Sequence, residues 1–194
     1  GKFHPQLIRA LLNILEIKPG HTVLDPMAGS STVSVEANLL GIDSISIDLS
    51  PFCELMGKVK TFSLDLDVEK LESVTINPGA ILERLNKHKV PEYFINNKVE
   101  IDKEYYEITL LAYLDAVGFA NRSSASVETL FPRVLDRYVS TIRNFQQARE
   151  TLGLKIGRSK IMQGNALDLP IDDNSIDAII TSPPYSFAID YLKN

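Results

Sequence analysis

The chain has 194 residues, of which 44% are hydrophobic and 23% charged, a composition typical of a folded globular domain. No apolar run approaches the roughly 18 residues of a membrane span, and no signal-peptide pattern opens the chain, so we expect no membrane contact. The single cysteine, Cys53, excludes an internal disulfide and a cysteine-rich metal site, so we expect no metal and a cytoplasmic location. The net charge of -5 counts against a broadly basic nucleic-acid surface. A local basic face remains open, with candidates Arg133, Arg137, Arg143 and Arg149.

The first 60 residues alternate helical and strand patterns. Pro5 favours a helix start, and leucines at helical spacing carry that helix to about Ile17, before Lys18-Pro19-Gly20. A strand over 21–25, a helix over 31–40 and a strand over 44–48 follow, with a further helix expected after Pro51. This order predicts a βαβ crossover and therefore a parallel sheet.

The middle of the chain changes character. Apolar residues recur at helical spacing between 61 and 157, and the last long helix is predicted to begin at Pro132 and to end at Gly153. Strand patterns return over 160–163 and 176–182. We therefore predict an α/β domain with a mostly parallel sheet, formed by residues 1–60 and 158–194 and interrupted by a helical insertion over 61–157.

Several polar residues follow the strands of this predicted sheet. Asp25 ends the first strand, Gly29 allows close backbone approach, and the helix after Ser31 points its N-terminus at the same edge. Asp48 ends the second strand, close to the ~20-residue spacing of a ribose-binding acid, and Asn165 follows the third. Taken singly, Asp48 could cap a helix and Asn165 could be a turn residue. Their conjunction favours S-adenosylmethionine, whose ribose, sulfonium and adenine need such groups.

A second motif, Ser182-Pro183-Pro184-Tyr185, follows the apolar run that ends the predicted fourth strand. The exocyclic amine of a nucleobase is conjugated with its ring and is a poor nucleophile. The Ser182 side chain and the Pro183 carbonyl could accept its N–H bonds and free the nitrogen lone pair. The two prolines would hold these acceptors in place, and Tyr185 offers a flat face to an extruded base. Alone, the motif could be a proline-rich turn after a buried strand.

These motifs resemble those of the amino-methyltransferases that modify cytosine N4 or adenine N6 in DNA. The stretch Asp25-Pro26-Met27-Ala28-Gly29-Ser30-Ser31-Thr32 is similar to the family's Asp-Pro-x-Ala-Gly-Ser-Gly-Thr loop, with Ser31 in place of glycine. The leading serine of the second motif resembles the cytosine-N4 subgroup. Lys2-Phe3-His4-Pro5 resembles the segment beside the methionine end of the cofactor. Gln163-Gly164-Asn165-Ala166 resembles the Gly-Asp-Ala element, with Asn165 replacing the acid.

The resemblance implies a class I, Rossmann-like methyltransferase fold with strand order third, second, first, fourth. Only four of the family's roughly seven strands are visible, so we expect a truncated domain. The implied catalytic residues are Ser182, Pro183, Pro184 and Tyr185. The implied contacts to S-adenosylmethionine are His4, Asp25, Pro26, Ala28, Gly29, Asp48, Leu49, Asn165 and Ala166. The implied reaction is methyl transfer to an exocyclic amine of DNA, cytosine N4 in particular, within a restriction–modification system.

Two other functions stay open from the sequence. Enzymes that methylate the N2 amine of guanine in RNA carry a similar Asp/Asn-Pro-Pro-Tyr loop, although they usually add an RNA-binding module. A non-catalytic module that binds a cofactor or a partner protein is the third reading, consistent with the acidic net charge. The sequence does not indicate the oligomeric state.

Overall fold

The computed structural model describes residues 3–87 and 102–183. The chain divides into two compact units. Residues 1–57 and 156–194 form the first, called the sheet unit, and residues 58–155 form the second, called the helical unit. Within the described part of the chain, no helix is both long and apolar enough to cross a membrane.

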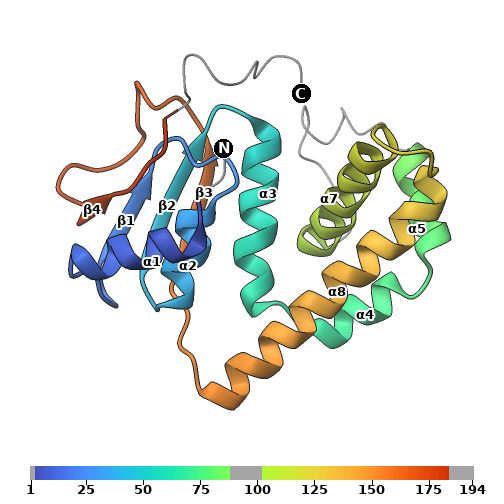
Figure 1. The fold of residues 1–194 in the computed structure, drawn as a ribbon, viewed down its shortest axis with the longest axis horizontal. Coiled ribbons are helices and arrows are strands. Elements are labelled where there is room, and N and C mark those ends of the chain that lie inside the picture. Colours follow the sequence, from blue (N-terminus) through green and yellow to red (C-terminus); the bar gives the residue numbers. More distant parts are fainter. Residues whose placement is uncertain (1–2, 88–101, 184–194) are drawn as a thin grey trace. The chain divides into compact units, whose positions relative to one another are not determined.

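The sheet unit contains a four-stranded sheet in which every pairing is parallel. The strands are β1 (Thr22–Asp25), β2 (Asp43–Asp48), β3 (Ser159–Gln163) and β4 (Ala178–Ile179). Their spatial order is β3-β2-β1-β4, which confirms the predicted α/β fold and strand order (Figure 1). Because all strands run in one direction, their carboxyl ends share one edge of the sheet.

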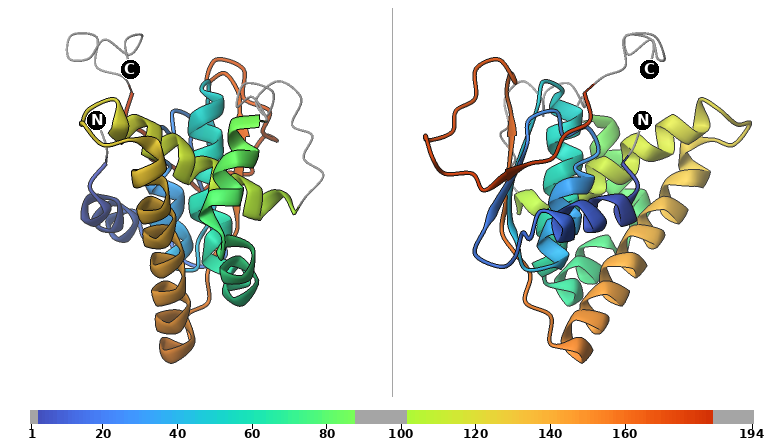
Figure 2. Two further views of the ribbon diagram at one scale, coloured as in Figure 1. Left: turned by 90° about the vertical axis from the view of Figure 1, so that its right-hand side faces the viewer. Right: turned by 60° about the vertical axis from the view of Figure 1, so that its left-hand side comes forward.

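Three helices pack on the same face of this sheet: α1 (Pro5–Ile14), α2 (Thr32–Leu39) and the first part of α3 (Pro51–Phe62) (Figure 2). On β2, the Ser46 hydroxyl is hydrogen-bonded at 2.7 Å to that of Ser34 on α2. Ser46 is in register with Ile161 of β3, whose side chain lies against Gly57 of α3. Right-handed crossovers from β1 to β2 and from β2 to β3 require this shared face. The core beneath α1 and α2 consists of Ile8, Leu12, Val23, Val33, Ala37, Ile42 and Ile180.

Strand β4 is shorter than the predicted strand over 176–182. Its ladder is restricted to Ala178 and Ile179, although the Ile180 N–H still donates to the Leu24 carbonyl at 3.0 Å. Ala178 and Ile180 pack toward α1, which places the intervening Ile179 on the opposite face, where 61% of it is exposed.

Helix α1 ends earlier than the apolar periodicity predicts. Glu16 adopts a left-handed conformation with φ of 54°, and the Ile17 N–H donates to the Leu12 carbonyl at 2.9 Å. This closing turn carries Ile17 back onto the core below α1. The helical spacing of Ile17 therefore reflects burial rather than a continued helix.

The described helical unit is built mainly from α4 (Val68–Thr75), α5 (Pro78–Lys87), α7 (Lys103–Ala120) and α8 (Val127–Leu152), after the short 3-10 helix η1 (Ser63–Asp65). Helices α7 and α8 form a hairpin (Figure 1). Every residue of α7 from Tyr105 to Ala112 is buried, and Phe131 and Leu135 of α8 are almost fully buried. The unit therefore has a core of its own.

The predicted start of α8 at Pro132 is wrong, because the helix begins at Val127 and contains Pro132. Ser126 caps the helix, and its hydroxyl accepts a hydrogen bond from the Thr129 N–H at 3.3 Å. Burial of Phe131, next in sequence to the proline, holds the helix together despite the missing N–H. The predicted end at Gly153 is confirmed, since this residue has a φ of 61°.

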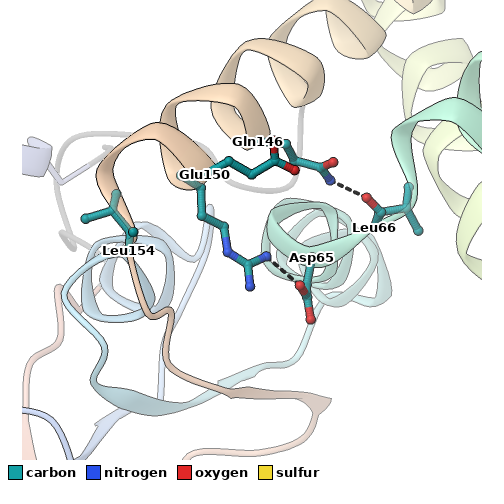
Figure 3. A pocket seen from close by; sticks show the side chains of 7 residues that line it. Asp65, Leu66, Gln146, Glu150 and Leu154 are labelled. Carbon is teal, nitrogen blue, oxygen red and sulfur yellow. Dashed lines mark hydrogen bonds and ion pairs between the residues drawn. The ribbon is translucent and has the colours of Figure 1, made fainter.

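Three hydrogen bonds join the first and last parts of the helical unit. The Arg149 guanidinium donates to the Leu64 carbonyl at 3.0 Å and also pairs with the Asp65 carboxylate. The Gln146 side-chain amide donates to the Leu66 carbonyl (Figure 3). These bonds, called the clamp below, connect η1 and the residue after it with the last two turns of α8.

Candidate active site

A cavity of about 470 Å³ lies at the carboxyl edge of β1 and β2. Its walls come from the loop after β1, the end of β2, the first turn of α3 and the segment after β4. The lining residues are Phe3, Asp25, Met27, Ala28, Gly29, Ser30, Thr32, Asp48, Leu49, Ser50, Cys53 and Ser182. Its size falls within the range of small-molecule sites, and it lies where open parallel sheets bind ligands.

The loop after β1 is held to β2 by its own backbone. The Ala28 N–H donates to the Ile47 carbonyl at 3.0 Å, and the Gly29 N–H donates to the Asp48 carboxylate at 2.8 Å. Gly29 has a φ of 49°, a conformation that glycine adopts without steric penalty. The loop therefore presents the Gly29 backbone to the cavity, next to Met27 and Ser30, which also line it.

Ser31 stands where the resembling loop has glycine, and the local conformation explains that preference. Its φ is 55°, which strains any residue with a Cβ, and its side chain makes no cap hydrogen bond to α2. The residue is fully buried, and among the described residues its hydroxyl has no hydrogen-bond partner. The hydroxyl lies so close to α3 that a Cβ added to Gly57 would come within 2.4 Å of it.

Asp48 is positioned by two backbone N–H groups. One carboxylate oxygen accepts from Gly29 at 2.8 Å, and the other accepts from Ser50 at 2.9 Å. A carboxylate has about four acceptor positions, so the side chain keeps capacity for groups in the cavity. The position that caps α3 is occupied instead by Ser50, whose carbonyl accepts from Glu54 at 3.1 Å.

Asp25 is a buried acid beneath the same cavity, with 2% of its surface exposed. The pKa of its carboxyl group is raised from 3.8 to about 6, mainly by burial and to a smaller degree by the nearby Asp48 carboxylate, although the Thr181 hydroxyl and the Met27 N–H act to lower it. The Met27 N–H donates to this carboxylate at 3.2 Å. Near neutral pH the group is therefore close to changing its charge.

The structure brings six of the sequence-predicted site residues to this one cavity: Asp25, Ala28, Gly29, Asp48, Leu49 and Ser182. His4 instead precedes the first turn of α1 and is exposed, and neither Pro26 nor Pro183 lines the cavity. Pro184 and Tyr185 lie outside the described residues.

Asn165 and its neighbour Ala166 are also absent from the cavity lining. The Asn165 side chain accepts a hydrogen bond from the Leu167 N–H at 3.0 Å, and its backbone pairs with Asp168 in an isolated bridge. In this conformation the side chain stabilises a local turn, the alternative that short polar residues often satisfy.

The cavity is also lined by residues outside the set predicted from the sequence, namely Phe3, Met27, Ser30, Thr32, Ser50 and Cys53. Four of them stand inside or beside motifs that were recognised. Ser50 and Cys53 are three residues apart at the start of α3, so helical spacing places them on the same side of that helix. That spacing was the available signal.

The helical unit contains a second cavity, of about 420 Å³, beside the clamp (Figure 3). Its Arg149 and Gln146 side chains already bind Asp65 and the carbonyls of Leu64 and Leu66. Since these polar groups satisfy one another, the cavity in the sheet unit is the stronger candidate for a ligand site.

Residues 1–107 match the family described as "RMKL-like, methyltransferase domain". The type II methyltransferase M.BsoBI of Geobacillus stearothermophilus is 25% identical, over 98% of this chain and 49% of its own length. The type II methyltransferase M.MjaII of Methanocaldococcus jannaschii is 38% identical, over 46% of this chain and 15% of its own length. The tRNA (guanine(10)-N2)-dimethyltransferase of the same organism is 25% identical, over 54% of this chain and 40% of its own length. No solved structure matches the chain significantly.

The matched regions span about half of the Geobacillus relative and smaller parts of the other two.

Proposed function

The chain belongs to the family described as RMKL-like, methyltransferase domain, and from this premise we propose that it is part of an enzyme that methylates an exocyclic amine of DNA. We place the cofactor in the cavity at the carboxyl edge of β1 and β2. The observation that carries the proposal is the convergence there of Asp48, the Gly29 backbone and Ser182, which come from three separate parts of the chain.

Methyltransferases of this type use S-adenosylmethionine, which supplies an electrophilic methyl group on a sulfonium. The residues present suit that molecule. Asp48 has free acceptor positions for ribose hydroxyls, the Gly29 turn leaves space for the amino-acid end, and the exposed side chain of Leu49 offers an apolar surface to adenine. Two carboxylates in one cavity also favour a ligand with net positive charge.

The proposed role of Ser182 is to act on the acceptor amine. Its hydroxyl and the Pro183 carbonyl would accept the N–H bonds of the amine, so that the nitrogen lone pair becomes available for the methyl group. Tyr185 would hold the extruded base by stacking. The leading serine of the motif favours cytosine N4 over adenine N6 as the target within this proposal.

A second candidate substrate is the N2 amine of guanine in RNA. It is favoured by the similarity to the archaeal tRNA dimethyltransferase, which covers more of this chain than the match to M.MjaII does. The DNA reading is preferred because the similarity to M.BsoBI extends over 98% of the chain.

Cofactor binding is tested by titration calorimetry with S-adenosylmethionine. We expect Asp48→Ala to weaken binding at least tenfold, because the ribose loses charge-assisted hydrogen bonds. Asp43→Ala is the matched control, since Asp43 begins the same strand, at the opposite end from the cavity. Equal affinity of the Asp48 variant and the parent would remove Asp48 from the cofactor site.

The substrate is tested by transfer of tritiated methyl groups in a chain extended to the length of the relatives. Mixed-sequence duplex DNA and unmodified tRNA are offered separately, and labelled nucleosides are identified after digestion. We expect N4-methylcytosine from DNA. Label in N6-methyladenine would correct the base, label in tRNA guanine would select the second candidate, and transfer to neither polymer would overturn the proposal.

A further inference from the structure

The four arginines of α8 that could form a basic face have different environments in the structure. Arg143 pairs with Glu72, and Arg149 pairs with Asp65, so both are used inside the helical unit. Among the described residues, Arg133 has no ion pair, and Arg137 makes only a cation–π contact, 5.8 Å from the centre of the Phe119 ring. Two arginines therefore remain available at the surface of α8.

These two arginines belong to a continuous polar stripe along the outside of the helix. Arg133 and Arg137 are four residues apart, and polar side chains, exposed except for the half-buried Ser140, continue their row in both directions at intervals of three or four. The row, called the outer stripe below, consists of Ser126, Thr129, Arg133, Arg137, Ser140, Asn144, Gln147 and Thr151. It contains no acidic residue.

Of the three acidic residues of α8, only Glu150 lies away from the outer stripe, whereas Asp136 lies beside it, three residues after Arg133, and Glu128 is hydrogen-bonded to Ser126 at its start. Asp136 and Arg143 line a cavity together with Glu72 of α4, and Glu150 lines the cavity beside Asp65. Glu128 lies in the first turn, where hydrogen bonds to the Glu128 backbone and the Ser126 side chain lower the pKa of its carboxyl group. The buried side of the helix carries Phe131, Val134, Leu135, Val139 and Ile142. The row of the stripe itself therefore carries only positive charge, with Asp136 at its margin.

The acidic excess of the chain does not lie in the helical unit. Residues 58–155 carry equal numbers of acidic and basic side chains, so the net charge of -5 belongs to the segments that form the sheet unit. The acidic total, which counts against a nucleic-acid surface, therefore does not describe the helical unit.

We propose that the outer stripe of α8 binds the sugar–phosphate backbone of duplex DNA. Arginine, serine, threonine, asparagine and glutamine are the side chains that contact phosphate oxygens, and in the described part of the chain no ion pair neutralises Arg133 or Arg137. The 26-residue helix is about 39 Å long, comparable to one turn of B-DNA. This surface deepens the proposed function, because it assigns the DNA partner of that function to a named helix face.

The test measures binding alone, so it does not depend on methyl transfer. Fluorescence anisotropy follows a labelled 20-base-pair duplex of mixed sequence at several salt concentrations. We expect the double variant Arg133→Gln with Arg137→Gln to bind about tenfold more weakly than the parent. The slope of log affinity against log salt should fall in magnitude by about 2, because two phosphate contacts are lost. Asn144→Asp, which adds one negative charge to the stripe, should also weaken binding.

The matched control is the double variant Lys18→Gln with Lys160→Gln, which removes two exposed positive charges from the sheet unit. We expect it to bind within twofold of the parent. All variants change exposed side chains, so unchanged circular dichroism and melting temperature verify the fold.

Three results would overturn the proposal. They are no duplex binding by the parent at low salt, equal losses in the stripe and control variants, and tighter binding of a duplex RNA of the same sequence. Failure of the proposed function is a separate outcome, recognised by cofactor affinity and methyl transfer. Stripe-dependent DNA binding together with absent transfer would retain the surface and reject the enzyme activity.

Discussion

The sheet unit and the helical unit use polar residues in opposite ways. In the sheet unit, Asp25 is buried below a cavity and Asp48 reaches the cavity with part of its hydrogen-bonding capacity free. In the helical unit, Arg149 and Gln146 beside the cavity are already bound to neighbouring groups, and the available arginines stand on an exposed helix face. The first arrangement suits a small ligand in a pocket, and the second suits a long polymer on a surface.

Among the substitutions considered, we expect the largest effect on stability from one in the core of the helical unit. We expect Phe131→Ala to lower the free energy of unfolding by about 3–5 kcal/mol, because the ring is completely buried and makes an edge contact with Tyr113. Leu152→Ala, at the exposed end of the same helix, should change it by about 0.5 kcal/mol or less. Urea unfolding followed by circular dichroism measures both.

Cofactor binding is assigned to the sheet unit, whereas Phe131 belongs to the helical unit. Phe131→Ala should therefore leave the affinity for S-adenosylmethionine unchanged under conditions where the protein is folded. A parallel loss of cofactor affinity would contradict this division.

The second prediction concerns the role of Ser182 in the sheet unit. In a chain extended to the length of the relatives, we expect Ser182→Ala to slow methyl transfer by about 10²-fold, the usual effect of losing one acceptor aimed at the reacting group. Cofactor affinity should stay within a factor of two, since the serine is assigned to the amine. Single-turnover kinetics and calorimetry separate the two quantities. Full activity of the variant would remove the serine from catalysis.

The third prediction uses the perturbed acid of the sheet unit. The pKa of Asp25 is raised from 3.8 to about 6, so the folded protein binds this proton more tightly than the unfolded chain. The stabilising contribution of protonated Asp25 is complete below pH 4 and is lost as the pH rises through 6. The loss is on the order of 2–3 kcal/mol at neutral pH.

Asp25→Asn retains an acceptor for the Met27 N–H and cannot ionise. We therefore expect it to abolish this part of the pH dependence and to raise stability at pH 7. Urea midpoints between pH 4 and pH 7 measure the effect, and an unchanged profile in the variant would assign the titration to another group.

The smallest effects concern the close contact of Ser31 with Gly57. We expect Ser31→Gly to stabilise the protein by about 0.5–1 kcal/mol, because it relieves the left-handed conformation and removes a buried hydroxyl without a described partner. Gly57→Ala should destabilise it by about 1–3 kcal/mol through overlap with that hydroxyl.

In the double variant part of the Gly57→Ala loss should be recovered, with a coupling energy of about 1 kcal/mol. The contact of the new methyl with Ile161 remains and limits the recovery. Thermal unfolding of the four proteins in the cycle provides the measurement, and strict additivity would contradict the contact.

Hydrophobic periodicity and turn residues were sufficient to predict the parallel sheet, and the family resemblance supplied its strand order. Local patterns failed where tertiary packing decided the outcome. Pro132 suggests a helix start, but the adjacent Phe131 is buried and keeps that turn helical. Ile17 has helical spacing, but it returns to the core through a left-handed residue.

The sequence could identify those cavity-lining residues that stand at the ends of strands. Asp25 and Asp48 reach it because parallel strands bring their carboxyl ends together. Asn165 also follows a strand, yet it bonds to its own turn, since a short amide can satisfy itself locally. Cys53 enters the cavity through the helix that follows β2, and no motif marks it.

The clamp has a consequence for how the chain reaches its fold. Strands β2 and β3 are neighbours in the sheet, although Ser44 and the Ser159 with which it pairs are 115 positions apart in the sequence. Closing so long a loop is entropically unfavourable and slows folding. If the helical unit folds first, it brings Leu64 next to Arg149. The loop that must then close between β2 and β3 is effectively much shorter. The insertion would then hasten β2–β3 pairing, and loosening the clamp should delay assembly of the sheet.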